Sequence, residues 1–224
     1  MTPEDVKYIR AYHFINEKYG LEALSNKRLK IARINDLNDP FEWLSPRLSD
    51  KDYRGRFSKL RMHDNATKGI LCFSKKWNDP VQWSHYGDKH KGICLGFDIP
   101  IEFAADIEYV HDRLHWERDA TGRMPSETIS KLFVTKFKHW EYEQEVRMFL
   151  SLDEGTAENG LYFYSFGKNL VLREIIAGPM SELSLETIRE AAGSNHGNVQ
   201  TSKARLAFTS FSVVRDKRCK VTMI

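Results

Sequence analysis

The chain has 224 residues, of which 41% are apolar and 12% aromatic, and its net charge is +3. This composition is typical of a folded soluble domain and excludes an intrinsically disordered chain. No run approaches the roughly 18–20 uncharged apolar residues of a membrane span, and the first residues lack the apolar core of a secretory signal. We therefore expect a cytoplasmic protein without a membrane segment.

The chain begins with an alternating stretch that favours a strand ending at Phe14. Asn16 is suited to cap a helix that ends near Asn26, and a second strand is expected over residues 29–34. Residues 35–43, NDLNDPFEW, are dense in Asn, Asp and Pro and predict a shaped turn. Residues 46–66 are polar with scattered apolar side chains and predict a surface helix.

The middle of the chain predicts a strand over 69–74, a short helix with Pro80 in its first turn, and strands over 92–99 and 106–110. Apolar spacing predicts an amphipathic helix over 126–139 with Ser126 as its cap. The remaining expected elements are strands over 145–152, 161–166 and 170–178, a helix over 181–193 ending at Gly193, and a weak hairpin from 198–204 to 211–216.

These strands outnumber the helices, and the helices are interspersed irregularly. No repeat or flexible linker divides the sequence. We therefore expect a single α+β domain over residues 1–224 with mixed or antiparallel sheets, and not a doubly wound sheet.

The three cysteines, Cys72, Cys94 and Cys219, are widely spaced. An odd number without a CxxC pair indicates neither a disulfide framework nor a metal site, so we expect buried thiols. Residues 26–33 and 202–220 are basic, a pattern that is compatible with a polyanionic partner but does not require one.

Glutamates at alternate positions, Glu141, Glu143 and Glu145, precede an apolar strand-like run. On a strand, Glu143 and Glu145 would share a face, with Arg147 and Lys136 available as counter-charges. They are either a solvated strand edge bound to Arg147 or a carboxylate pair in a partly desolvated cleft. The second arrangement prepares acid–base or cation-stabilising chemistry.

Other polar residues also have two interpretations. His13, between Tyr12 and Phe14, is by itself typical of a structural histidine. Trp83 and Tyr86 share a helical face and would stack on a planar ring or pack in the core. Residues 35–42 favour a rigid turn over a metal loop.

Several familiar catalytic patterns are missing from the sequence. His85 and His90 are five apart and do not form a helical zinc pair. The sequence contains no GxSxG, HExxH, Walker or GxGxxG motif.

Three blocks, YHF…LKIARINDLNDPFE, LCFSKKWNDPVQWSHYGDKHKGICLGFD and TKFKHWEYEQEVR, occur in this order. Over about residues 12–178 they resemble the bacterial family called domain of unknown function 2971, which brings no settled activity. The YHF strand, a helix, a strand with Arg33 and a distant glutamate at a strand start also resemble the His…Tyr…Glu layout of ADP-ribosyltransferases. Within that superfamily, the sequence most resembles the branch of toxins that modify nucleic acids.

The second resemblance implies an ADP-ribosyltransferase-like fold and NAD as co-substrate, with no metal. His13 would hold a ribose hydroxyl, Arg33 would bind phosphate, and Glu145 or Glu143 would support the cation and orient the nucleophile. Tyr86 or Phe73 would stack on nicotinamide. The further residues implied on the NAD side are Phe14, Ser74 and Trp83.

The leading hypothesis is therefore an enzyme that modifies a macromolecule, with nucleic acid as a candidate substrate, acting as a toxin or phage-defence effector. An antitoxin or regulatory protein is a candidate partner, and the oligomeric state is open. The alternatives are a non-catalytic binding or regulatory domain, with Glu143 paired to Arg147, and a nuclease-like hydrolase built on His13, His85 and the glutamates with Asp39 as a metal ligand.

Overall fold

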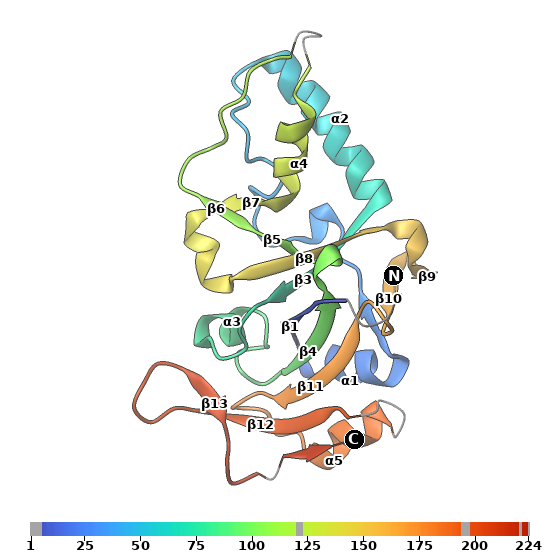
Figure 1. The fold of residues 1–224 in the computed structure, drawn as a ribbon, viewed down its shortest axis with the longest axis vertical. Coiled ribbons are helices and arrows are strands. Elements are labelled where there is room, and N and C mark those ends of the chain that lie inside the picture. The colour runs from blue at the N-terminus through green and yellow to red at the C-terminus, as the bar shows by residue number, and fades with distance from the viewer. Residues whose placement is uncertain (1–5, 120–122, 194–197, 220, 224) are drawn as a thin grey trace.

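The computed structural model describes residues 6–119, 123–193, 198–219 and 221–223. A mixed sheet curls into a half-barrel that forms the centre of the molecule (Figure 1). Its strands are, in spatial order, β13 (Val213–Arg215), β12 (Gln200–Leu206), β11 (Val171–Ala177), β4 (Ile93–Pro100), β1 (Tyr8–Ile15), β3 (Lys68–Ser74), β8 (Glu145–Ser151) and β5 (Ala105–Asp106), with β14 (Thr222–Met223) paired to β12.

Two smaller sheets flank this one. The first contains β2 (Arg28–Lys30), β10 (Leu161–Ser165) and β9 (Thr156–Glu158), and the second is the parallel pair β6 (Glu108–Val110) and β7 (Thr135–Phe137). The predicted single α+β domain with mixed sheets is confirmed at this level.

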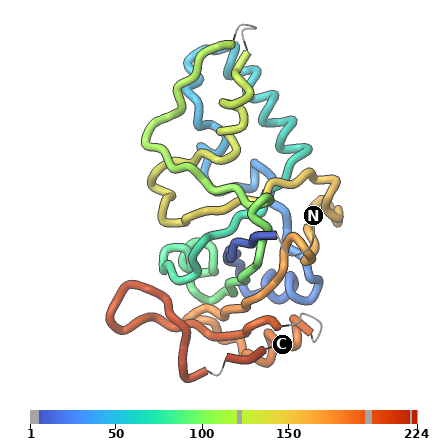
Figure 2. Tube along the Cα trace, viewed as in Figure 1, coloured from blue at the N-terminus to red at the C-terminus, as the bar shows by residue number. Residues whose placement is uncertain are grey.

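The α-helices are α1 (Glu17–Asn26), α2 (Lys51–Thr67), α3 (Pro80–His85), α4 (Ser126–Val134) and α5 (Leu185–Ala192). Short 3-10 helices are η2 (Ile34–Asp36), η3 (Ile101–Phe103), η4 (Lys138–Glu143) and η5 (Leu152–Glu154). Helices α2 and α4 lie at one end of the elongated molecule, and α5 with β12 and β13 lies at the other (Figure 2). Within the described residues, no helix is long and apolar enough to cross a membrane.

Local capping chemistry sets the predicted helix starts. The Asn16 side chain accepts a hydrogen bond from the Tyr19 amide at 2.8 Å and begins α1. Asp79 accepts from the amides of Val81 and Gln82, with Pro80 as the first residue of α3. These interactions satisfy amide groups that have no partner within the helix, which is why short polar residues mark helix starts.

Several predicted elements were too long. The helix predicted over 181–193 begins only at Leu185, after its cap Ser184, and ends at Ala192. The helix predicted over 126–139 ends at Val134, because Thr135–Phe137 leaves the helix and pairs with β6, placing Lys136 opposite Tyr109. Ser126 is the first residue of α4 and not its cap. The strand predicted over 29–34 stops at Lys30, and Ala32 forms a bridge with Ile70 of β3 instead. At residues 135–137 and at Ala32, pairing in the folded chain overrides the local pattern.

The predicted strand over 106–110 is also wrong in detail, because it divides in two. Ala105–Asp106 pairs with β8, whereas Glu108–Val110 pairs with β7. The buried Ile107 lies between them, and its amide donates to the Glu145 carbonyl at 3.2 Å. This division brings the β6–β7 pair, and with it Lys136, next to the start of β8.

Strand β1 is paired very unequally on its two sides. It is in register with β4 along its whole length, from Tyr8 opposite Pro100 to Ile15 opposite Ile93. It is in register with β3 only where Tyr12 faces Ser74. The two neighbouring strands β1 and β3 therefore diverge on leaving this point, and residues of both line one cleft.

Candidate active site

A cleft of about 540 Å³ opens where β1 and β3 diverge. Its wall is completed by α3, by η4 with the start of β8, and by the turn that follows η2. The structure therefore brings together segments from the beginning, middle and later part of the chain. The residues predicted for the site that line this cleft are His13, Phe14, Phe73, Ser74, Tyr86, Glu143 and Glu145.

Two predicted residues do not line the cleft. Arg33 lies at the start of η2, where its backbone amide donates to the Asp36 carboxylate at 3.2 Å. Trp83 is completely buried beneath Phe14, with ring centroids 5.1 Å apart, and its indole N–H donates to the Trp77 carbonyl at 2.6 Å. The core-packing interpretation therefore holds for Trp83.

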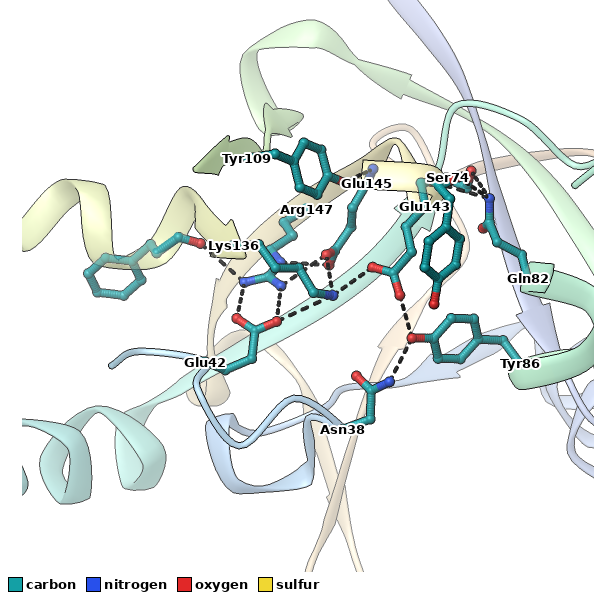
Figure 3. Close-up of polar contacts among 12 residues, drawn as sticks. Asn38, Glu42, Ser74, Gln82, Tyr86, Tyr109, Lys136, Glu143, Glu145 and Arg147 are labelled. Carbon is teal, nitrogen blue, oxygen red and sulfur yellow. Dashed lines mark hydrogen bonds and ion pairs between the residues drawn. The ribbon is translucent and has the colours of Figure 1, made fainter. Parts of the chain in front are cut away.

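A cluster of buried charges forms the floor of the cleft (Figure 3). We call it the charge cluster, and its members are Glu42, Lys136, Glu143, Glu145 and Arg147, none of which is more than 5% exposed. Three carboxylates share two cations, so the fully ionised cluster carries one excess negative charge. Buried charges of this kind are tolerated only when they are paired and hydrogen-bonded.

Arg147 joins two carboxylates through four hydrogen bonds. It makes paired hydrogen bonds to Glu42 at 2.7 and 3.1 Å and to Glu145 at 2.6 and 3.0 Å. A fifth bond reaches the Phe133 carbonyl at 3.3 Å. Because a guanidinium has five N–H groups, this residue is saturated and rigidly placed. Burial lowers the pKa of Arg147, but Glu145 and the other neighbours raise it well above its ordinary value.

Lys136 occupies the centre of the charge cluster. Its ammonium lies 2.6 Å from Glu143, 3.1 Å from Glu145 and 3.4 Å from Glu42. The expectation that Lys136 serves as a counter-charge is thus met by the geometry. Glu143 pairs with Lys136, whereas Arg147 pairs with Glu145, so the Glu143–Arg147 pair expected of a binding domain is not the one formed.

Glu143 and Glu145 reach the same site from different backbone structures. Glu143 ends η4 and Glu145 begins β8, with Gln144 between them in the left-handed region at φ 44°. The prediction that both glutamates lie on one strand is therefore wrong, although both contact Lys136. Glu141, earlier in η4, is exposed and pairs with Lys138 at 2.5 Å outside the cluster.

The two cluster glutamates differ in electrostatic environment. Burial raises the pKa of Glu143, and the Lys136 ammonium and the Tyr86 hydroxyl only partly oppose it. Burial acts in the same direction on Glu145, but Arg147 and Lys136 outweigh it and lower its pKa to about 2. Glu145 is accordingly fixed as a structural anion, whereas Glu143 is less tightly held in its charged form.

Tyr86 connects Glu143 to the mouth of the cleft. Its hydroxyl donates to the Glu143 carboxylate at 2.5 Å and accepts from the exposed Asn38 side chain at 2.7 Å. Burial and the adjacent Glu143 raise the pKa of Tyr86, so it stays a neutral phenol. Phe73 is only 3% exposed and packs edge-on against His13 and Phe97. Tyr86 is the better placed of the two predicted stacking rings.

His13 is held in one tautomer by the main chain. Its Nδ1 lies 2.9 Å from the Cys72 carbonyl oxygen. Because a carbonyl only accepts, Nδ1 carries the proton and Nε2 of the neutral ring is left as an acceptor. Burial lowers the pKa of His13, opposed only in part by the Cys72 carbonyl. A half-buried, neutral imidazole therefore lines the cleft.

Ser74 marks the point where β1 and β3 meet. Its hydroxyl donates to the Glu143 carbonyl at 2.7 Å and accepts from the Gln82 amide at 3.0 Å. Gln82 also donates to the carbonyls of Tyr142 and Glu143 at 3.3 Å. The Ser74 hydroxyl thus fixes the end of η4, and with it the position of Glu143.

The cleft thiol does not have the properties of a nucleophile. Cys72 is half-buried at the cleft, and burial together with the neighbouring Glu145 raises its pKa well above the ordinary value. A reactive cysteine requires the opposite shift. Of the three free cysteines only Cys94 is buried, so the expectation of buried thiols is confirmed for that residue alone.

The turn over residues 35–43 supplies both Asn38 and Glu42 to the cleft. Asp39 accepts from the Phe41 amide at 2.9 Å, as expected of a rigid turn. In the described part of the chain no group of three or more His, Cys, Asp or Glu side chains is arranged to hold a metal ion. Sequence reasoning did not assign Glu42 to the carboxylate cluster, although its place beside Asp39 and Pro40 marked it as fixed in position.

Comparison with models of known protein families, with curated proteins and with solved structures gave no match to this chain.

Proposed function

We propose that the protein breaks the nicotinamide–ribose bond of NAD and transfers ADP-ribose to a macromolecule. The observation that carries this proposal is a single cleft containing a neutral histidine acceptor, an aromatic ring and a buried carboxylate, namely His13, Tyr86 and Glu143. These are the groups that a reaction through a cationic sugar requires.

In the proposed reaction the bond between ribose C1′ and the nicotinamide nitrogen breaks, and its electron pair leaves with nicotinamide. Positive charge then develops on C1′ and the ring oxygen. The acceptor forms the new bond to C1′ and loses a proton. A fixed carboxylate stabilises the developing cation, and the excess negative charge of the cluster acts in the same direction.

Glu143 is the carboxylate we assign to this role. Glu145 is fully engaged by Arg147 and Lys136, and its pKa of about 2 makes it a poor proton acceptor. Glu143 lies beside Tyr86 at the cleft, and its raised pKa suits it to take the acceptor proton and pass it to solvent. Glu145 then acts as a positioning residue through Lys136.

A second hollow that shares His13 with the cleft is our candidate for the other half of NAD. A neighbouring hollow of about 580 Å³ is also lined by His13, together with Arg28, Lys30 and Phe163. The Arg28 guanidinium lies 3.9 Å from the centre of the Phe163 ring. We assign phosphate binding to Arg28 and Lys30 in place of Arg33, because a guanidinium and an ammonium are suited to phosphate oxygens. Phosphate would replace Glu158, which lines the same hollow and pairs with Arg28 at 2.6 Å.

The direct test is incubation of the purified chain with NAD labelled in its adenylate half, in the presence of bacterial RNA, DNA or lysate. We expect nicotinamide release together with transfer of label to a macromolecule. If neither occurs and saturating NAD gives no shift in the thermal unfolding temperature, the protein is not an NAD-dependent transferase.

The state of His13 makes NAD binding sensitive to pH. A ribose hydroxyl donates to Nε2 only while the ring is neutral, and the pKa of His13 is lowered from its ordinary 6.5. Affinity should therefore be constant above pH 6.5 and should fall as the pH drops through the lowered pKa. Calorimetric titration with NAD over this range measures the effect.

The variant His13→Asn provides the control for this pH dependence. The Asn side-chain amide can still donate to the Cys72 carbonyl, but the variant lacks the Nε2 acceptor of the imidazole. We expect NAD binding about 3- to 10-fold weaker at neutral pH, the effect of one hydrogen bond, and no loss of affinity on acidification from this residue. If the pH dependence of NAD affinity is the same in the variant as in the wild type, His13 does not bind NAD.

A further inference from the structure

A groove of about 760 Å³ lies beside the cleft, between the segment that follows β3 and the β12–β13 hairpin. We call it the basic groove. Tyr12 lines both the basic groove and the cleft, so the two hollows adjoin at the point where β1 meets β3. In Figure 1 the α3 segment and the turn of the β12–β13 hairpin project from the same side of the molecule.

The walls of the basic groove are held together by main-chain bonds. The Val213 amide donates to the Asn78 carbonyl at 2.9 Å, which ties the hairpin to the segment before α3. The Lys75 amide donates to the Gln144 carbonyl at 3.0 Å, which ties the same segment to the η4–β8 junction. The groove is therefore part of the folded framework.

The lining of this groove contains both aromatic rings and cations. Trp77, Tyr142 and Phe211 line it, and Phe211 is fully exposed at the hairpin turn. The chain does not cover this ring, so a ligand in the groove can reach it. Together the three rings offer flat surfaces on which bases can stack.

The cations of the groove are Lys75, Lys76 and Arg215, and Asp79 is the acidic residue of its lining. Two of these cations are also paired with carboxylates outside the lining, Lys75 with Asp106 and Arg215 with Glu174. The Asp79 carboxylate already accepts two amides at the start of α3. Lys75 pairs with Asp106 at 2.8 Å, but both side chains are exposed, so this pair is weak and exchangeable. Arg215 is positioned 5.3 Å from the Trp77 ring centre by its bonds to Glu174 and Ser202.

We propose that the basic groove binds single-stranded nucleic acid and presents it to the cleft as the acceptor. A groove that combines cations with rings for stacking can hold a single strand without reading its sequence. A duplex would hide its bases from Trp77 and Phe211 and bind mainly through phosphate charge. The acceptor role rests on the proposed transferase function, whereas binding itself does not.

The test measures fluorescence anisotropy of labelled single-stranded DNA, single-stranded RNA and duplex DNA with the full chain, without NAD, at several salt concentrations. We expect tighter binding of single strands than of duplex. Phe211→Ser should weaken it about 5- to 150-fold, the effect of one stacked base. Lys76→Ala should reduce the slope of log affinity against log salt by about 0.7.

The matched control is Phe208→Ser, on the same hairpin turn but outside the groove lining, where the ring is 88% exposed. Binding should be unchanged in this variant. No binding at low salt, or equal weakening by the Phe208 and Phe211 substitutions, overturns the inference. Nicotinamide release without strand binding would support the transferase proposal and contradict nucleic-acid binding by the basic groove. Strand binding without nicotinamide release would support the groove proposal and contradict the transferase proposal.

Discussion

Replacement of Glu143 by Gln is expected to lower the turnover number for nicotinamide release by about 10²–10³-fold, the usual effect of removing one preorganised electrostatic group. Gln has the same size but no charge, so it no longer stabilises the cation that forms at ribose C1′. KM for NAD should change little, because the lost interaction is made mainly in the transition state. Initial rates of nicotinamide release over a range of NAD concentrations measure both quantities.

Glu141→Gln is the matched control, since Glu141 lies in the same 3-10 helix but is exposed and bonded to Lys138. It should retain full turnover. Far-ultraviolet circular dichroism and thermal unfolding of both variants check that the fold is intact. If the turnover number of Glu143→Gln is within threefold of the wild-type value, Glu143 has no catalytic role.

Replacement of Arg147 by Met should lower the free energy of unfolding by about 3–5 kcal/mol, as found when one partner of a buried ion pair is removed. Met fills much of the same volume, but Glu42 and Glu145 would remain buried with only Lys136 to neutralise them. Urea denaturation monitored by tryptophan fluorescence should show the midpoint lowered by about 1 M or more.

Arg173→Met provides the comparison, because Arg173 also forms an ion pair, with Asp98 at 2.9 Å, but its side chain is 41% exposed. This substitution should lower the free energy of unfolding by less than about 1 kcal/mol. If the two substitutions cost the same, the charge cluster does not contribute the stability that its burial implies.

The Arg147→Met effect should also depend on pH. In the wild type the pKa of Glu145 is lowered to about 2, so its ionised form favours the fold above its ordinary value of 4.5 and this contribution is lost as the pH falls toward 2. In the variant Arg147 no longer opposes the effect of burial on the pKa of Glu145. Protonation of Glu145 at low pH then removes its poorly paired charge. The difference in stability should therefore be smaller at pH 3 than at pH 7.

Much of the fold could be predicted because local chemistry and tertiary structure agree there. Asn16 and Asp79 cap the helices they precede, and the apolar runs of β3, β4 and β8 are buried strands. Prediction failed where long-range pairing decided the outcome. Residues 135–137 continue a helical pattern but pair with β6, and nothing local to that segment indicates its partner.

The site was predictable in its residue types more than in its geometry. His13, Tyr86 and the two glutamates meet in one cleft, but Glu143 enters it from a 3-10 helix through the left-handed Gln144, which no strand pattern indicates. Arg33 was assigned through the resemblance to ADP-ribosyltransferases and lies outside the cleft lining. Glu42 was considered only as a metal ligand beside Asp39, because its bond to Arg147 joins residues 105 positions apart.

The divergence of β1 from β3 has a consequence for mutagenesis of the cleft. Beyond Tyr12 the two strands are out of register, and the Cys72 carbonyl accepts a hydrogen bond from the His13 ring. Backbone groups are present whatever the side chain is. A substitution at Cys72 keeps this carbonyl in place, so alanine scanning does not report what the backbone at this position contributes to the orientation of His13.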